Sequence, residues 1–163
     1  MNYHNITHND MLNGDGIRVV LWVSGCNHGC KNCQNPQTWD ERSGIVFDDY
    51  AFKEVLDQLS KDYVSGLTLS GGDPLYPGNR DDVYFIVQAV KQLFPTNTIW
   101  LYTGYSYEEV KDLNIMHFVD VLVDGPFIEA QKDLALKWRG SSNQRVIDVQ
   151  KSMKENNVVL YCD

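Results

Sequence analysis

Three cysteines stand within eight residues of this chain, as Cys26, Cys30 and Cys33. Thiolates in such a compact group ligate zinc or iron, and three of them can hold three corners of a four-iron, four-sulfur cluster. The remaining cysteine, Cys162, is the penultimate residue of the sequence, so no nearby thiol completes a set of four. A cluster held by these three thiolates would keep one iron open to a further ligand.

A glycine pair follows in the sequence, in Gly71-Gly72-Asp73-Pro74. Because glycine lacks a β-carbon, the backbone N–H and C=O groups of this segment can approach a ligand closely, and Asp73 can accept from an ammonium group. A tight turn leading into a helix is the alternative interpretation. Next to an open iron, the motif favours S-adenosylmethionine (SAM), with the methionine end on the iron and its amino group held by the Gly-Gly-Asp backbone.

The cysteines also allow a closed, structural zinc site. Its fourth ligand would be Cys162 or one of the histidines His4, His8 and His28. A zinc-stabilised binding module would need no glycine pair in a neighbouring loop, and this difference favours the cluster. We expect His28 to face solvent or to contact the metal ligands without binding the metal, because a histidine ligand would close the open iron.

The charge balance argues against nucleic acid as a partner. The 163 residues carry a formal charge of −8, with 14 basic and 22 acidic side chains, and no lysine or arginine cluster is available to neutralise phosphates. The N-terminal residues lack the pattern of a secretory signal, and no apolar run approaches the roughly 20 residues of a membrane span. We therefore expect a cytoplasmic protein, in which thiols remain reduced and bind metal rather than pair as disulfides.

Apolar runs alternate with amphipathic segments along the chain. The runs predict strands over 17–23, 66–70, 98–102 and 118–123. Helical spacing predicts helices over 48–59 and from 79 or 81 to 94, and a capping box at Ser106 and Glu109 predicts a short third helix. Beyond these, 129–137 has a weak helical pattern, and 145–149 and 158–161 have weak strand patterns.

This alternation predicts an α/β fold with right-handed crossovers and a parallel sheet. Four strands are too few for a closed eight-stranded barrel, so we expect a partial (β/α) barrel or a curved open parallel sheet. Ligands of such sheets bind at the carboxyl ends of the strands. The cysteines, Gly71-Gly72-Asp73-Pro74, Thr103-Gly104-Tyr105 and Asp124-Gly125-Pro126 each follow a predicted strand. We expect one domain over 1–163, with a core over about 14–126 and a C-terminal extension over about 127–163.

The cysteine and glycine motifs together resemble the radical SAM superfamily. Further segments resemble the activating proteins of anaerobic (class III) ribonucleoside-triphosphate reductases, over about residues 2–148. These segments are Asn13-Gly14-Asp15-Gly16-Ile17-Arg18, Ser24-Gly25-Cys26, Leu69-Ser70-Gly71-Gly72-Asp73-Pro74-Leu75, Trp100-Leu101-Tyr102-Thr103-Gly104-Tyr105, Val121-Leu122-Val123-Asp124-Gly125 and Trp138-Arg139-Gly140-Ser141-Ser142-Asn143-Gln144-Arg145.

The resemblance implies a radical SAM oxidoreductase. A reduced [4Fe-4S] cluster, supplied with an electron by a flavodoxin-type donor, would cleave SAM into methionine and a 5′-deoxyadenosyl radical. That radical would take a hydrogen atom from a glycine of the large reductase subunit and leave a glycyl radical there.

The resemblance also assigns site residues. Cys26, Cys30 and Cys33 would ligate the cluster, and the other assigned residues would bind SAM. Asn32 and Gln34, on either side of Cys33, would touch the adenosyl group through their backbone. Gly71, Gly72 and Asp73 would bind the methionine end, and Thr103, Asp124 and Gly125 the ribose or methionine portion.

Two further segments remain open at this stage. We expect Arg18, within a strand, to satisfy a local carboxylate or carbonyl, although an anion-binding role is an alternative. The pattern of segment 138–145 predicts a surface loop, and the resemblance implies that this loop contacts the reductase.

Two alternative functions remain within enzymes. They are an activase of another glycyl radical enzyme and a radical SAM enzyme of another kind. Enzymes of small molecules usually have extra domains, whereas a short chain suits a partner that inserts a loop.

Overall fold

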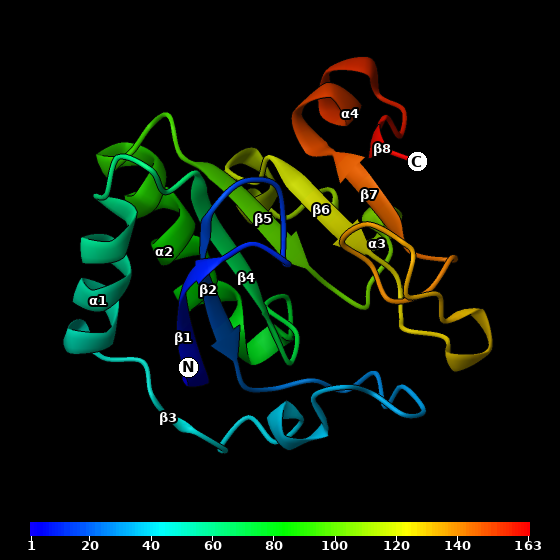
Figure 1. The fold of residues 1–163 in the computed structure, drawn as a ribbon, viewed down its shortest axis with the longest axis horizontal. Coiled ribbons are helices and arrows are strands. Elements are labelled where there is room, and N and C mark those ends of the chain that lie inside the picture. Colours follow the sequence, from blue (N-terminus) through cyan, green and yellow to red (C-terminus); the bar gives the residue numbers. More distant parts are fainter.

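The computed structural model describes residues 1–163 and contains one open sheet of eight strands, in the order β3-β1-β2-β4-β5-β6-β7-β8 (Figure 1). The strands are β1 (Asn2–Asp10), β2 (Arg18–Val23), β3 (Ile45–Val46), β4 (Gly66–Gly71), β5 (Thr98–Tyr102), β6 (Val121–Asp124), β7 (Arg145–Asp148) and β8 (Leu160–Cys162). The helices are α1 (Asp49–Leu59), α2 (Arg80–Leu93), α3 (Tyr107–Val110) and α4 (Val149–Glu155). Short 3₁₀ turns cover Pro36–Thr38, Pro77–Asn79, Asn114–His117 and Glu129–Gln131.

The four strands predicted over 17–23, 66–70, 98–102 and 118–123 form the centre of the sheet. Strands β2, β4, β5 and β6 are neighbours and run parallel. Parallel neighbours need a crossover connection, and α1 and α2 lie in two of these crossovers. The predicted α/β class is therefore confirmed, and all four carboxyl ends meet at one edge.

The expectation of an all-parallel sheet is wrong at both margins. Strand β1 pairs antiparallel with β2 and β3, and β7 pairs antiparallel with β6 and β8. No crossover-length helix separates β1 from β2 or β6 from β7, so the chain turns back on itself there. The polar sequence of β1 concealed a strand, because only Tyr3 and Ile6 of its nine residues are buried in the core.

The two faces of the sheet carry different side chains, because successive residues of a strand point to opposite sides. One set, which includes Leu67, Leu69 and Leu101, packs with α1 and α2 into the main core of 26 buried residues. The other set packs around Trp100 in a second, smaller cluster with Val121, Val123 and Val146. Trp138 from the segment between β6 and β7 packs against this second cluster.

The predicted capping box forms, whereas one of the predicted helices does not. The Asp48 side chain accepts from Ala51 N at 2.9 Å and caps α1, and Ser106 and Glu109 form the predicted capping box. The helix expected over 129–137 is wrong, because only the turn Glu129–Gln131 forms and Lys132 then makes an isolated antiparallel bridge with Ser141. None of the helices combines the length and apolarity that a membrane crossing requires.

Arg18 of β2 is fully buried and has no carboxylate partner. All five of its N–H groups donate to oxygen at 2.8–3.0 Å, so its expected local role is confirmed, with carbonyl and hydroxyl acceptors. Burial lowers the pKa of Arg18 to about 10. The acceptors are the side chains of Thr68 and Thr98 and the carbonyls of Asp15, Leu67 and Thr98.

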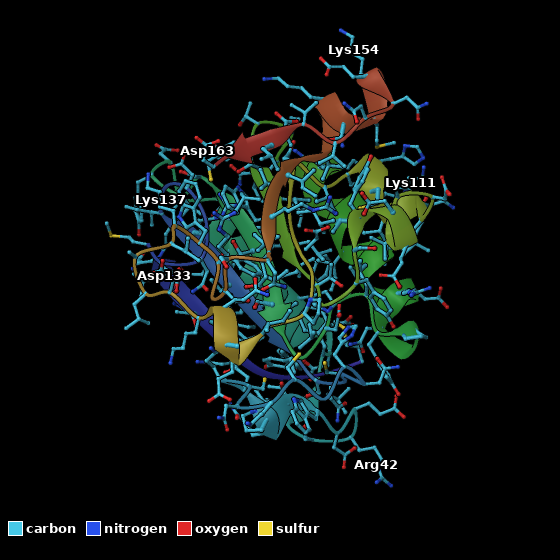
Figure 2. All side chains as sticks on the ribbon, turned by 90° about the vertical axis from the view of Figure 1, so that its right-hand side faces the viewer. Arg42, Lys111, Asp133, Lys137, Lys154 and Asp163 are labelled. Atoms are coloured by element: carbon cyan, nitrogen blue, oxygen red, sulfur yellow. The ribbon has the colours of Figure 1, made fainter.

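We expect Arg18→Lys to lower the free energy of unfolding by about 2–4 kcal/mol, because an ammonium group has three donors and leaves buried oxygens unsatisfied. Urea denaturation followed by circular dichroism measures the change. The control is Arg42→Lys, since Arg42 projects from the surface (Figure 2) and its side chain is 87% exposed. Equal stability of the two variants would contradict the structural role of Arg18.

Candidate cluster and cofactor site

One pocket collects residues from the loops after β2, β4, β5 and β6. Parallel strands bring these loops together because their carboxyl ends share an edge of the sheet. Nine of the eleven residues assigned from the sequence line it, and they come from all four loops. They are Cys26, Cys30, Cys33, Gln34, Gly71, Gly72, Asp73, Thr103 and Gly125.

The three clustered cysteines are unpaired and partly exposed in this pocket. Burial raises the pKa of Cys26 to about 11, and the nearby Asp73, Cys30 and Cys33 add to the effect. The N–H of Asn35 donates to Cys33 Sγ at 3.3 Å. Three thiolates here need a cationic centre to offset burial and mutual repulsion, and iron supplies that charge. The donor set therefore fits a metal cluster.

The cysteine loop is fastened to the Gly71-Gly72-Asp73 loop through the backbone. The N–H of Asp73 donates to Gly25 O at 2.7 Å, and that of Gly72 to Val23 O at 2.8 Å. A β-carbon on Gly72 would lie 2.5 Å from Gly25 O, closer than real contacts allow. Glycine is thus required where the two loops meet.

The carboxylate of Asp73 joins three loops. Its Oδ2 accepts from His28 Nε2 at 2.6 Å, Thr103 Oγ1 at 2.9 Å and Gly104 N at 3.0 Å, and its Oδ1 accepts from Leu75 N at 2.8 Å. Asp73 is only 1% exposed. Its contribution to the pocket is therefore to hold the loops in place, since both of its oxygens are already bound.

His28 lies inside the cysteine loop and turns toward Asp73. The hydrogen bond to the Asp73 carboxylate raises the pKa of His28. The ring also packs edge-on against Tyr105, with 4.6 Å between centroids. His28 is engaged in this way and not turned to the thiols. In addition, no three or more cysteine, histidine or acidic side chains lie close enough together to hold a single metal ion.

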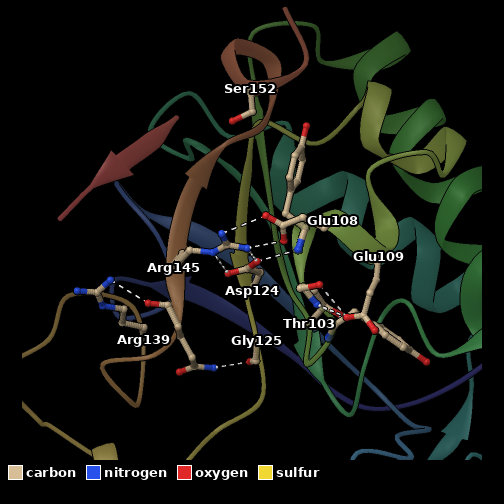
Figure 3. Close-up of polar contacts among 12 residues, drawn as sticks. Thr103, Glu108, Glu109, Asp124, Gly125, Arg139, Arg145 and Ser152 are labelled. Atoms are coloured by element: carbon tan, nitrogen blue, oxygen red, sulfur yellow. Dashed lines mark hydrogen bonds and ion pairs between the residues drawn. The ribbon is translucent and has the colours of Figure 1, made fainter. Parts of the chain in front are cut away.

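Asp124 does not line the pocket, although the neighbouring Gly125 does. Its buried carboxylate accepts from Arg145 Nη2 at 2.5 Å, Arg145 Nε at 3.1 Å and Tyr107 N at 2.8 Å (Figure 3). Arg145 also donates to Glu108 at 2.8 Å, which lowers the pKa of Glu108. Asp124 therefore anchors β7 and α3 to the end of β6.

Asn32 is the second assigned residue that does not line the pocket. Its backbone has a left-handed φ of 55°, a conformation that asparagine adopts more readily than most residues. The side chain donates to the Glu129 carboxylate, and Lys31 lies 3.6 Å from the same carboxylate. Asn32 thus ties the cysteine loop to the turn after β6.

Several lining residues were not assigned a role from the sequence. Strand alternation would have found two of them, because Ser70 and Tyr102 lie at the ends of β4 and β5 and alternate with core leucines. Gln144 is positioned by tertiary contact, since its Nε2 donates to Gly125 O at 3.0 Å (Figure 3). The others are His28, Asn35, Trp39, Gly104 and Phe127.

Comparisons with known proteins agree with this geometry. A family model described as a 4Fe-4S single cluster domain matches residues 12–147. An anaerobic ribonucleoside-triphosphate reductase-activating protein of enterobacteria phage T4 is 49% identical over 148 residues, which cover 90% of this chain and 93% of the relative. This chain belongs to that activating-protein family. Relatives with the same name from Haemophilus influenzae and Escherichia coli K12 are 43% and 41% identical, over 88% and 90% of this chain and 96% and 97% of their own lengths.

The resemblance noted from the motifs is thereby confirmed. Within the match to the cluster domain lie all three clustered cysteines, the glycine pair and the ion pair of Asp124 with Arg145. Cys162 lies outside it, on β8. For this activating-protein family member, the iron–sulfur cluster domain thus includes the four central strands and β7 up to Ile147.

We expect Arg145→Ala to lower the free energy of unfolding by about 3 kcal/mol, because it leaves the buried Asp124 carboxylate without an opposite charge and with only the Tyr107 N–H as donor. This value is at the lower end of the range for such losses, since the Arg145 side chain is itself 34% exposed. Thermal denaturation measures it. The control is Lys53→Ala, which breaks an exposed pair with Asp57 and is expected to cost under about 0.5 kcal/mol. Similar losses in both variants would contradict the anchoring role.

Proposed function

We propose that this chain activates an anaerobic ribonucleoside-triphosphate reductase by reductive cleavage of SAM at a [4Fe-4S] cluster held by Cys26, Cys30 and Cys33. When bound, such a cluster would supply the electron for cleavage of SAM into methionine and a 5′-deoxyadenosyl radical, and that radical would take a hydrogen atom from a glycine of the large reductase subunit. The observation that carries the proposal is a single pocket lined by three free thiols and the Gly71-Gly72 pair, without a fourth cysteine.

The chain's own residues position and enclose the reactants. The backbone of Gly71 and Gly72 lines the pocket next to the cysteines and would bind the methionine end of SAM. Asp73 keeps the cysteine loop, the β4 loop and the β5 loop at fixed separation through its four hydrogen bonds. Gln34 and Gly125 provide the wall toward the adenosyl portion.

Asp124 and Asn32 have supporting roles in this proposal. The ion pair of Asp124 with Arg145 holds the neighbouring Gly125 in the wall of the pocket. The hydrogen bond from Asn32 to Glu129 holds the cysteine loop against the turn after β6. A flavodoxin-type protein would donate the electron, and the reaction would take place in the cytoplasm, where thiolate ligands remain reduced.

Low-temperature electron paramagnetic resonance (EPR) of the protein, reconstituted with iron and sulfide without air and reduced with dithionite, tests the proposal. We expect a four-iron cluster signal whose g-values move when SAM is added. Incubation with the reductase and SAM is then expected to produce a glycyl radical doublet. Binding of zinc in place of the cluster, or a cluster signal indifferent to SAM, would refute the proposed chemistry.

Replacement of one cluster ligand separates the thiols from the rest of the fold. We expect Cys30→Ala to abolish formation of 5′-deoxyadenosine from SAM, with the circular dichroism spectrum retained. Cys162→Ala is the matched control, because it removes the fourth cysteine on β8, away from the pocket, and is expected to leave the rate unchanged. Loss of cleavage in both variants, or in neither, would contradict the ligand set.

A β-carbon on the glycine pair tests the cofactor cradle. We expect Gly72→Ala to weaken SAM binding at least about tenfold, because its β-carbon would collide with Gly25 O and force the two loops apart. Equilibrium dialysis of the reconstituted protein measures the affinity. In the control Gly78→Ala, the nearest atom to the new β-carbon is the flexible Glu41 carboxylate at 3.0 Å, and we expect normal affinity. Equal affinities would argue against the cradle.

A further inference from the structure

Among the tyrosines, only Tyr102 has a buried hydroxyl without a hydrogen-bond partner. The residue lines the cluster pocket at the end of β5. Burial raises the pKa of Tyr102, so the hydroxyl keeps its hydrogen. An unsatisfied buried group of this kind costs about 1–3 kcal/mol. The fold thus keeps a neutral phenol beside the thiols, and no group of the chain binds its hydroxyl.

Further aromatic side chains lead away from Tyr102 on the sheet face opposite α1 and α2. Tyr102 and Trp100 are two residues apart on β5, so they share this face with Cα atoms roughly 7 Å apart. The Trp100 ring centroid lies 4.9 Å from that of Trp138 and 5.2 Å from that of Tyr161. Trp138 and Tyr161 are 5.9 Å apart, and Tyr102 and Trp138 both pack against the cluster around Trp100. We call these four side chains the aromatic path.

The aromatic path joins two separate hollows at opposite edges of the sheet. Tyr102 lines the cluster pocket at the carboxyl ends of the central strands. Trp100 and Tyr161 line a hollow of ≈ 520 Å³ that includes residues at the amino ends of β5 and β6, and the two hollows share no lining residue. Tyr161 lies on β8 at the margin of the sheet (Figure 1) and is 40% exposed. The path therefore runs from the cluster pocket to solvent.

The side chains of the path are those that lose an electron readily. Indoles and phenols are oxidised more easily than aliphatic side chains or phenylalanine. The main core of 26 buried residues contains no tryptophan, whereas Trp100 and Trp138 both belong to the path. Aliphatic residues would fill the same space and could not carry an electron.

Nearby cations prevent a radical from resting on the indoles. The guanidinium carbon of Arg18 lies 5.6 Å from the ring centroid of Trp100, and Lys137 Nζ lies 4.8 Å from that of Trp138. An indole that loses an electron becomes positively charged, and these neighbours repel that charge. The indoles can therefore transmit an electron but do not retain the radical.

Tyr161 differs because a base accepts its proton. Its hydroxyl donates to Asp15 Oδ2 at 2.9 Å. When Tyr161 loses an electron, its proton can pass to this carboxylate, and the phenoxyl radical that remains is neutral. The exposed end of the path is therefore the place where a radical is best stabilised.

We propose that Tyr102 and the aromatic path quench the 5′-deoxyadenosyl radical when no reductase is bound. This inference rests on the proposed function. The C5′ atom of the radical takes the hydrogen atom of Tyr102 Oη, so that a C–H bond forms, the weaker O–H bond breaks and Tyr102 becomes a phenoxyl radical.

The aromatic path then restores Tyr102. An electron moves from Tyr161 through the indoles to the Tyr102 phenoxyl, which takes a proton from water in the pocket, and the Tyr161 proton passes to Asp15. The Tyr161 phenoxyl takes one electron from the reductant that also reduces the cluster and regains its proton from Asp15. In sum, one radical, one electron and one proton give 5′-deoxyadenosine, and the chain is unchanged.

The first experiment follows the hydrogen atom. The reconstituted protein cleaves SAM with dithionite in D₂O without reductase, and mass spectrometry measures deuterium in the 5′-deoxyadenosine. Because a phenolic hydrogen exchanges with solvent, we expect deuterium in the wild-type product and its loss in Tyr102→Phe. This substitution removes only an unpartnered hydroxyl, so we expect an unchanged thermal midpoint.

Cys162→Ala is the matched control for the first experiment. It removes another exchangeable hydrogen, on a thiol that also packs against the cluster around Trp100. We expect the product of this variant to keep its deuterium. Loss of deuterium in Cys162→Ala would assign the hydrogen atom to the thiol and overturn the role of Tyr102.

The second experiment follows the electron in the metal-free protein and needs neither cluster nor SAM. Azide radicals made by pulse radiolysis oxidise accessible indoles, and absorbance distinguishes indole radicals from phenoxyl radicals. We expect first-order transfer from indole to phenol in the wild type and loss of most of its amplitude in Tyr161→Phe. The control is Tyr50→Phe, at an 85% exposed position on α1, and it is expected to keep the wild-type transfer.

The outcomes distinguish the aromatic path from the proposed function. A wild-type protein that does not cleave SAM would refute the proposed function and the role of Tyr102 with it. If SAM is cleaved, a wild-type product without deuterium, or a Tyr102→Phe product with as much as the wild type, would overturn that role and leave the proposed function intact. Equal transfer in Tyr161→Phe and the wild type would overturn the path.

Discussion

The site depends on the need to satisfy one buried carboxylate. Asp73 is almost fully enclosed, and an ionised carboxylate in such a place is tolerated only with several donors. The donors come from the cysteine loop, the β5 loop and the turn that follows Asp73 itself. Meeting this requirement fixes the distance between the thiols and the glycine pair, which is the distance that a cluster and its cofactor would have to fit.

The same principle operates a second time at the end of β6. Asp124 is buried there, and the chain satisfies it with Arg145 from β7 and with the N–H of Tyr107. This ion pair draws the segment between β6 and β7 across the sheet, so that Gln144 and Phe127 become part of the pocket wall. The C-terminal region thus completes the site, although it supplies no predicted ligand to the cluster.

One face of the sheet forms the core and the other forms the site, and this difference follows from strand geometry. Leucines on one face pack against α1 and α2 and provide most of the core. The alternate residues, including Ser70, Trp100 and Tyr102, face the side without these helices and line the pocket or belong to the smaller cluster around Trp100. A stable core and an open reactive face can therefore be encoded in the same strands.

The sequence by itself determined the chemistry and the centre of the fold. Spacing of Cys26, Cys30 and Cys33, the glycine pair and the apolar runs are local patterns, and local patterns specify strands, caps and ligand sets without knowledge of distant residues. Tertiary structure decided which distant partner each polar group takes. Asp124 pairs with Arg145 and not with the pocket, Asn32 turns to Glu129, and the polar β1 becomes a strand because β2 offers an unpaired edge. These choices depend on groups that only the folded chain brings within hydrogen-bonding distance.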